Sequence, residues 1–179
     1  MRKNHHTAIV DLFKEHFKDN HLVGIEIGTA QALLTKTLLM HFPNLDFIYT
    51  IDPFLFIPGG FFEASVGDQA WHDDRRHQAE VALAVYEGRY SLLRTTSDDA
   101  VTKTPNEVDF VYIDGDHSEP QVYKDLTNYY PKVKNGGIFG GHDYHQVIKT
   151  LRDLMPEGLI FLGDDWTWWL IKDERVMHV

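Results

Sequence analysis

The sequence contains no cysteine and relatively few basic residues, and both shortages narrow its possible functions. Without cysteine, the chain has no disulfide, no thiolate zinc site and no cysteine nucleophile. Its 17 lysines and arginines are outnumbered by 27 aspartates and glutamates, which gives a formal net charge of −10 at pH 7. A chain this acidic is poorly matched to a phosphate backbone, so we expect no nucleic-acid partner.

Long apolar runs are also missing. No stretch approaches the roughly 20 apolar residues of a membrane-spanning helix, so no membrane partner is expected. The basic start, Met1 to His6, is not followed by the apolar core of a signal peptide, which predicts a cytoplasmic protein. Hydrophobic residues make up 43% of the 179 residues, without a repeat, linker or low-complexity tract. We therefore expect a single ordered domain over residues 1–179.

Short runs rich in β-branched and aromatic residues alternate with helical patterns along the chain. The runs predict strands at 22–27, 45–51, 90–95, 108–113, 138–141, 159–162 and 166–171. Helices are expected at 5–18, up to about 41, at 68–87 and after the third, fourth and fifth strands, with Asn135-Gly136-Gly137 as the turn before the fifth strand. The last two strands are expected to form an antiparallel hairpin. The pattern predicts an α/β fold with a Rossmann-like, seven-stranded, mostly parallel sheet, an antiparallel last strand and helices on both faces.

An aromatic segment, residues 53–70, interrupts this alternation as a loop insertion. It holds two prolines, a glycine pair at 59–60 and four phenylalanines: Phe54, Phe56, Phe61 and Phe62. Such a loop either covers a ligand site and excludes water or forms a dimer contact, and both alternatives stay open. The tryptophans at 166, 168 and 169 would also suit a homodimer interface.

The most informative stretch runs from Asp109 to Tyr144, where two strands are joined by a helix. Parallel neighbours end at the same edge of a sheet, so Asp114, His117, His142 and Asp143 should converge there. Two carboxylates and an imidazole, from Asp114, Asp143 and His142, make a divalent-metal site. His117 is then available as a general base, with Asp116 as the alternative. The competing interpretations are helix capping for Asp116 or His117 and a turn role for His142.

Two further strand ends favour a nucleoside ligand. Glu26, Gly28 and Thr29 stand where the first strand turns into a helix, and glycine there lets a ligand approach the backbone. Asp52 ends the second strand, where a carboxylate accepts both hydroxyls of a ribose. A dinucleotide motif GxGxxG would need glycine at positions 30 and 33, which are alanine and leucine.

Ser97 and Asp98 follow the third strand. They suit contact with an adenine ring, through a side-chain acceptor and a backbone N–H. Capping of the next helix is the equally favoured alternative.

The order EIG, D, SD, DFVYIDGDHS and NGGIFGGHDY resembles that of class I S-adenosylmethionine-dependent methyltransferases, over about residues 22–171. It is most similar to the small bacterial branch with sugar and natural-product O-methyltransferases. The resemblance implies a cofactor set of Glu26, Gly28, Thr29, Asp52, Ser97, Asp98 and Asp114, a metal set of Asp114, His142 and Asp143, and a base at His117. Within the implied cofactor set, Asp52 would bind the ribose, and Ser97 and Asp98 would contact the adenine.

Two departures from this family qualify the expectation. Ala30 and Ala32 stand where glycine is frequent, which should tighten the loop. His142 stands where metal-dependent relatives usually carry an acid, so Mn²⁺ or Zn²⁺ is favoured over Mg²⁺. The expected function is S-adenosylmethionine-dependent O-methylation of a small hydroxylated metabolite or sugar, with or without assistance from a divalent metal. The alternatives are an NAD-dependent oxidoreductase and a non-catalytic nucleoside-binding module.

Overall fold

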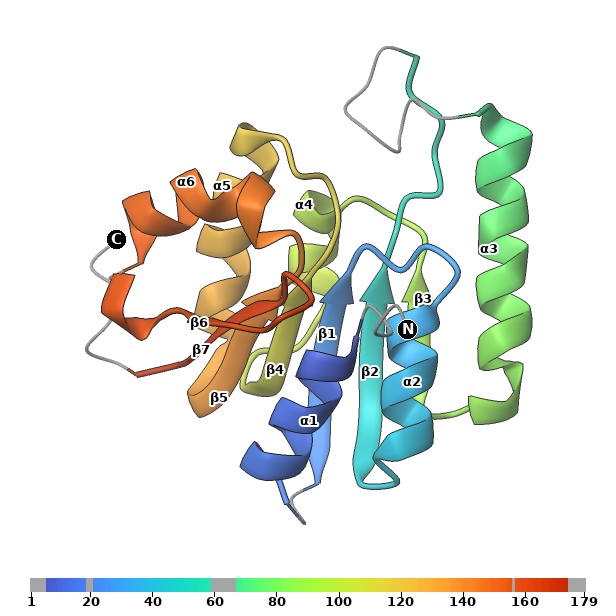
Figure 1. The fold of residues 1–179 in the computed structure, drawn as a ribbon. Helices are drawn as coiled ribbons and strands as arrows, with labels where there is room; N and C mark the ends of the chain where they lie inside the picture. Colours follow the sequence, from blue (N-terminus) through green and yellow to red (C-terminus); the bar gives the residue numbers. More distant parts are fainter. Residues whose placement is uncertain (1–5, 19–20, 59–66, 156, 174–179) are drawn as a thin grey trace.

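A computed structural model of the chain describes residues 6–18, 21–58, 67–155 and 157–173, and its centre is a seven-stranded sheet (Figure 1). The strands lie in the order β3-β2-β1-β4-β5-β7-β6. β1 to β5 are parallel, whereas β7 runs antiparallel to both β5 and β6, which confirms the predicted fold class. Their bounds are β1 Leu22–Ile27, β2 Leu45–Ile51, β3 Tyr90–Leu93, β4 Val108–Ile113, β5 Val133–Gly141, β6 Phe161–Leu162 and β7 Trp168–Ile171.

Six α-helices of the described chain cover both faces of this sheet. Buried side chains of the first three pack on one face, and those of the last three pack on the other. Their bounds are α1 Thr7–His16, α2 Leu33–His41, α3 Gln69–Leu83, α4 Ser97–Ala100, α5 Glu119–Tyr129 and α6 Tyr144–Leu154. Short 3-10 turns lie at Ala84–Tyr86, Val101–Lys103, Tyr130–Lys132 and Glu157–Leu159.

Side chains of flanking residues begin two of these helices. Asp68 accepts a hydrogen bond from the Trp71 N–H at the start of α3, and Thr96 accepts one from the Asp99 N–H at the start of α4. Each cap satisfies an amide that the first helical turn leaves without a partner. The cap of α4 is therefore Thr96 and not Ser97 or Asp98.

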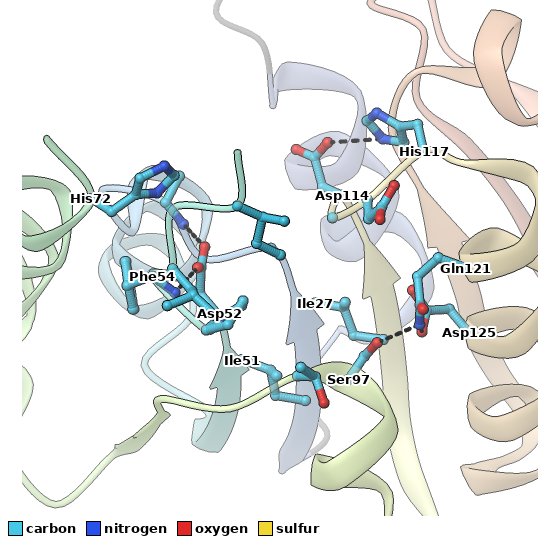
Figure 2. Close-up of a pocket in the computed structure, with 18 of the residues that line it drawn as sticks. Ile27, Ile51, Asp52, Phe54, His72, Ser97, Asp114, His117, Gln121 and Asp125 are labelled. Carbon is cyan, nitrogen blue, oxygen red and sulfur yellow. Dashed lines mark hydrogen bonds and ion pairs between the residues drawn. The ribbon is translucent and has the colours of Figure 1, made fainter. Parts of the chain in front are cut away.

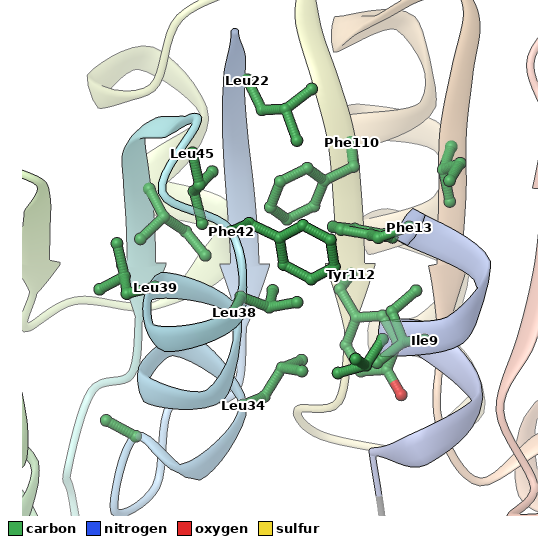
Figure 3. Packing of buried hydrophobic residues seen from close by; sticks show 14 of the residues in the cluster. Ile9, Phe13, Leu22, Leu34, Leu38, Leu39, Phe42, Leu45, Phe110 and Tyr112 are labelled. Atoms are coloured by element: carbon green, nitrogen blue, oxygen red, sulfur yellow. The ribbon is translucent and has the colours of Figure 1, made fainter. Parts of the chain in front are cut away.

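Aromatic packing fixes α1 on the sheet (Figure 3). The Phe13 ring of α1 lies edge-on to Phe110 of β4, with 4.7 Å between ring centroids, and 5.7 Å from the ring of Phe42. Phe110 has room because its neighbour in β1 is Gly24, where an added Cβ would lie 2.0 Å from the Phe110 Cζ. The glycine of β1 is thus a packing requirement of the core.

β5 is longer than the sequence predicts, because the expected turn at Asn135-Gly136-Gly137 lies within the strand. The register between β4 and β5 shifts between Val108 and Phe110, and Gly136 has φ +77°. Glycine here accommodates an irregularity in the ladder instead of ending the strand. The first residue of β7 is Trp168, which is buried, whereas Trp166 before it is 58% exposed.

Only part of the aromatic segment belongs to the described chain. The glycine pair at 59–60, Phe61 and Phe62 lie outside the described residues. Phe54 is 2% exposed, and the Phe56 N–H donates to Gln69 Oε1 at 3.0 Å. Across the ranges described, no helix combines the length and the apolar character needed to cross a membrane.

Candidate active site

A cavity of about 400 Å³ opens at the carboxyl ends of β1, β2 and β4 (Figure 2). Its walls come from the strand ends, from the turn before α4, and from one side each of α3 and α5. Predicted site residues in its lining are Gly28, Asp52, Ser97, Asp114, Asp116, His117 and Asp143. The topology therefore gathers seven of the predicted residues around one space.

The turn after β1 is built around Gly28. Its N–H donates to the Ile51 carbonyl at 2.8 Å, and its φ is +92°. An added Cβ would lie 1.9 Å from the carbonyl oxygen of Asp114, so no other residue fits between β2 and β4. Ala30 and Ala32 follow with φ +47° and +59°, in a region that side chains disfavour.

Asp52 holds this turn with its carboxylate. Its Oδ2 accepts from the Ala30 N–H at 2.9 Å, and its Oδ1 accepts from the Phe54 N–H at 2.8 Å. The residue also lines the cavity. Asp52 thus fixes two loops at the wall of the cavity.

Glu26 and Thr29 are not in the cavity lining that the described residues form. Glu26 is 2% exposed and accepts hydrogen bonds from the hydroxyls of Thr35 and Thr50. The Thr29 hydroxyl lies 2.5 Å from that of Thr50, so the same network supports the glycine turn from behind. Burial raises the pKa of Glu26 to about 7, although its two hydrogen bonds oppose the shift.

Asp114, His117 and Asp143 form a compact cluster at the β4 and β5 ends. His117 Nε2 lies 3.8 Å from Asp114 Oδ1, and His117 Nδ1 lies 3.8 Å from Asp143 Oδ2. One ligand atom from each of the three lies within 4.8 Å of the others. The His117 side chain is 7% exposed, and each carboxylate side chain is 26% exposed. An imidazole thus stands between two carboxylates at the cavity wall.

His142 lies beside this cluster and outside the cavity lining of the described chain. Its Nδ1 is 3.5 Å from Asp143 Oδ1, and its carbonyl accepts from Trp168 Nε1 at 3.1 Å. Burial lowers its pKa, but the hydrogen bond to Asp143 and the charges of Asp114 and Asp143 outweigh burial, so the pKa is raised. Of the two histidines, the structure groups His117 and not His142 with both carboxylates.

Two further acids of the predicted site, Asp143 and Asp116, have different local surroundings. Asp143 adopts a left-handed backbone conformation at φ +49°, which aspartate tolerates better than most residues. The hydrogen bond to His142 lowers its pKa, and the nearby His117 and His145 add to that effect. Asp116 accepts from the Ser118 N–H at 2.8 Å, whereas the Ser118 side chain makes no cap hydrogen bond. Asp116 therefore supports the turn that leads into α5, although Ser118, and not Asp116, stands at the cap position of that helix.

The consecutive residues Ser97 and Asp98, at the start of α4, have side chains in different environments. Ser97 is 8% exposed and lines the cavity. The Asp98 carboxylate, whose side chain is 39% exposed, pairs instead with Lys124 Nζ at 2.7 Å. Gln121 and Asp125 of α5 line the cavity beside Ser97, and neither was predicted from the sequence. Their four-residue spacing, on the helix face that carries Val122 and Leu126, is the signal that would have found them.

Residues 25–144 match the methyltransferase domain family. The chain belongs to this family. The match confirms the resemblance to class I S-adenosylmethionine-dependent methyltransferases, and it contains every residue of the cavity lining. No curated protein sequence matches the methyltransferase.

Solved structures share the fold of the methyltransferase at low sequence identity. An O-methyltransferase from Bacillus cereus in complex with SAH is 11% identical, with TM-score 0.62 over 92% of this chain and 79% of that one. A ribosomal protein L11 methylase from Lactobacillus delbrueckii subsp. bulgaricus is 16% identical, with TM-score 0.59 over 98% and 81%. TrmN from Thermus thermophilus is 13% identical, with TM-score 0.59 over 90% and 46%. The methyltransferase thus spans less than half the length of TrmN.

A further wall of the cavity comes from α3, a helix that was not predicted to contribute to the site. Trp71, His72 and Arg75 line it, and the Arg75 guanidinium lies 4.4 Å from the centroid of the Trp71 ring. His72 is 7% exposed, and its buried Nε2 has no hydrogen-bond partner among the described residues. Polar residues on a largely polar helix give little sequence signal, because most such residues face water.

Proposed function

We propose that the protein transfers the methyl group of S-adenosylmethionine to a hydroxyl of a small metabolite or sugar, with His117 as the base. The observation that carries this proposal is the placement of His117 between Asp114 and Asp143, in the same cavity as Gly28 and Asp52. One space thus holds a nucleoside-binding edge and a group that can take a proton.

The cofactor would lie across the strand ends. The Asp52 carboxylate at the cavity wall suits the ribose hydroxyls, and the Gly28 turn allows close approach of the methionine part. Asp114 and Asp143 place negative charge at the other end of the cavity, which favours a sulfonium cation.

In the reaction, the acceptor oxygen attacks the methyl carbon and the carbon–sulfur bond breaks. Its electron pair stays on sulfur and yields S-adenosylhomocysteine, while the hydroxyl proton passes to His117. The two carboxylates would stabilise the imidazolium that forms and hold its ring in place. A positioned base of this kind contributes roughly 10²–10⁴-fold to the rate.

The cluster also fits the divalent metal that the sequence predicts, although with a different histidine. Two carboxylates and one imidazole within 4.8 Å suit Mn²⁺ or Zn²⁺, and such an ion would lower the pKa of an acceptor hydroxyl. A nitrogen that ligates a metal has no lone pair for a proton, so the two roles of His117 exclude each other. Turnover after treatment with a chelator separates them: activity that survives assigns His117 as base.

A small acceptor is supported by charge and by the lining of the cavity. The chain carries a formal net charge of −10, which opposes contact with a nucleic-acid backbone. Phe54, Leu55, Ile57 and Trp71 give the cavity an apolar wall next to its acidic cluster, as a hydroxylated ring requires.

The test combines binding with turnover. S-Adenosylhomocysteine should bind by calorimetry, and labelled S-adenosylmethionine should methylate a member of a panel of sugars and phenols. His117→Ala and Asp143→Ala should keep cofactor affinity within a few-fold and lower turnover by roughly 10²-fold or more. His77→Ala changes an exposed histidine of α3 and serves as the matched control.

Several results would contradict the proposal. Binding of NADH and not of S-adenosylhomocysteine would favour the oxidoreductase alternative. Cofactor binding with no methylation of any panel member or of RNA would favour the non-catalytic module. Methylation of RNA alone would replace the acceptor class, and full turnover in both variants would remove His117 and Asp143 from the mechanism.

A further inference from the structure

The wall of the cavity that α3 forms differs in charge from the rest of the lining. The acids among the described lining residues are all aspartates: Asp52, Asp114, Asp116, Asp125 and Asp143. Arg75 of α3 is the one lysine or arginine in that described lining. Because a guanidinium stays protonated in proteins, the cavity has a fixed positive charge on the α3 wall and negative charge elsewhere.

The α3 wall lies across the cavity from the proposed base. Figure 1 shows the N-terminal half of α3 extending past the carboxyl end of β2. In Figure 2, His72 of α3 lies on one side of the cavity, whereas Asp114 and His117 lie on the other. Arg75 follows His72 by three residues on the same helix and lines the same cavity. A ligand in the cavity therefore meets the guanidinium and the acidic cluster from different walls.

Trp71 holds the guanidinium of Arg75 in place. The two residues are four apart on α3, and the Arg75 Cζ atom lies 4.4 Å from the centroid of the Trp71 ring. Both side chains line the cavity and are partly exposed, so a ligand can reach them. A guanidinium stacked on an indole keeps its N–H groups at its edge, as a planar fork that matches a carboxylate or a phosphate. This preorganisation lowers the entropy cost of binding an anion.

The polar neighbours of Arg75 on α3 are less suited to a ligand. The Asp73 Oδ1 atom accepts from Gln69 Nε2 at 3.1 Å and lies 3.4 Å from Arg94 Nη2, so this acid is already paired. The Nε2 atom of His72 is enclosed by the protein and offers no surface to the cavity. Arg75 is therefore the group on this wall that can bind an anion.

We propose that the acceptor carries an anionic group, a carboxylate or a phosphate, which Arg75 binds while the hydroxyl to be methylated faces His117. The inference rests on the proposed function, because it concerns the acceptor of that reaction. Asp114 and Asp143 repel an anionic group, and Arg75 attracts it towards α3. The opposite charges thus orient the acceptor and leave its hydroxyl at the base. One guanidinium suits one anionic group, whereas a polyanion still meets the net charge of −10.

The experiment measures the binding of matched small molecules to the protein saturated with S-adenosylhomocysteine, by calorimetry at pH 7.5. Among phenols, 4-hydroxybenzoate and 4-hydroxyphenyl phosphate carry the anionic group, and 4-hydroxybenzamide is the neutral counterpart. Glucuronate, glucose 6-phosphate and glucose form the same set for sugars. In at least one set, the wild-type complex should bind an anionic member about tenfold or more tightly than the neutral member. The preferred anion distinguishes a carboxylate from a phosphate.

Three variants assign this preference to a residue. Arg75→Ala keeps a good helix former and should bring the anionic and neutral members to similar affinities. Arg75→Lys keeps the charge without the planar fork and should retain only part of the preference. Arg76→Ala is the matched control, because the Arg76 guanidinium lies 3.5 Å from Glu80 and outside the described cavity lining. The control should keep the wild-type preference.

The failures are distinguishable. A wild-type protein that does not bind S-adenosylhomocysteine overturns the proposed function, and this inference with it. A wild-type complex without preference for any anionic member overturns the inference alone, as does an Arg75→Ala variant that keeps the preference or an Arg76→Ala variant that loses it. An Arg75→Ala variant that binds S-adenosylhomocysteine about tenfold more weakly assigns Arg75 to the carboxylate of the cofactor and overturns its role towards the acceptor.

Discussion

Two acids of the same part of the sheet, Glu26 and Asp114, have opposite environments. They lie at the carboxyl ends of the neighbouring strands β1 and β4, and Glu26 pairs in register with Tyr112. Glu26 is the residue before the last of its strand and turns its carboxylate towards threonine hydroxyls, at 2% exposure. Asp114 follows the last residue of its strand, lines the cavity and has a side chain that is 26% exposed. For these two acids, position relative to the strand end thus decides whether the carboxylate supports the fold or faces the cavity.

The largest expected effect would separate these two acids by activity. Asp114→Asn should lower methyl transfer by roughly 10³-fold, because it removes a charge that stabilises the His117 imidazolium. Glu26→Gln should keep turnover within a few-fold, because its carboxylate does not face the acceptor. Initial rates at saturating cofactor measure both. Equal losses in the two variants would end the distinction between a supporting acid and a reacting one.

The next effect concerns the glycine that lets the two strand ends meet. Gly28→Ala should lower the free energy of unfolding by about 3–4 kcal/mol, from left-handed backbone strain and a clash with the Asp114 carbonyl. Gly88→Ala is the control, because Gly88 also has positive φ but its added Cβ would meet nothing within 4 Å. It should lose only about 1 kcal/mol in urea unfolding. Similar losses in both variants would show that the contact between strand ends is unimportant.

The smallest effect is a pH dependence that belongs to Glu26. Its pKa is about 7 in the folded state, above the ordinary value of 4.5, so the folded state holds the proton more tightly. Stability from this group is present below pH 4.5 and is lost as pH rises towards 7, by about 3 kcal/mol at most. Relative to the wild type, Glu26→Gln should therefore be more stable at pH 8 than at pH 5.

Urea unfolding at several pH values checks this difference. His142, whose pKa is also raised, loses its stabilising effect as pH rises, and Asp143, whose pKa is lowered, loses its effect as pH falls. Both act in the wild type and in Glu26→Gln, so they cancel in the comparison. A constant difference between pH 5 and pH 8 would mean that Glu26 is not protonated in the folded protein near neutral pH.

The fold could be predicted from the sequence because the patterns that indicate strands and turns are local. The bounds of β1, β2 and β4 agree with those predicted, since each is a short β-branched run bordered by turn residues. The convergence of Asp114, His117 and Asp143 also followed from topology, because adjoining parallel strands end at one edge.

Side-chain direction was harder to predict. Glu26 is adjacent to the turn in sequence but faces the α2 side, and His142 and Asp143 are consecutive residues that serve different surroundings. The left-handed backbone of Asp143 separates them, and no residue pattern announces such a conformation. Gln121 and Asp125 were missed for another reason: the Gln121 amide joins Asp125 to Ser97 of α4, and only the folded chain brings these two helices together.

The alanines of the glycine turn have a consequence for heat tolerance. Ala30 and Ala32 both occupy the left-handed region, where an alanine is disfavoured by roughly 1–2 kcal/mol relative to its preferred conformation. Glycine at either place would release that strain and raise the melting temperature, but it would also loosen the backbone that Asp52 secures. A glycine substitution that makes this turn more thermostable would therefore lower its affinity for a ligand.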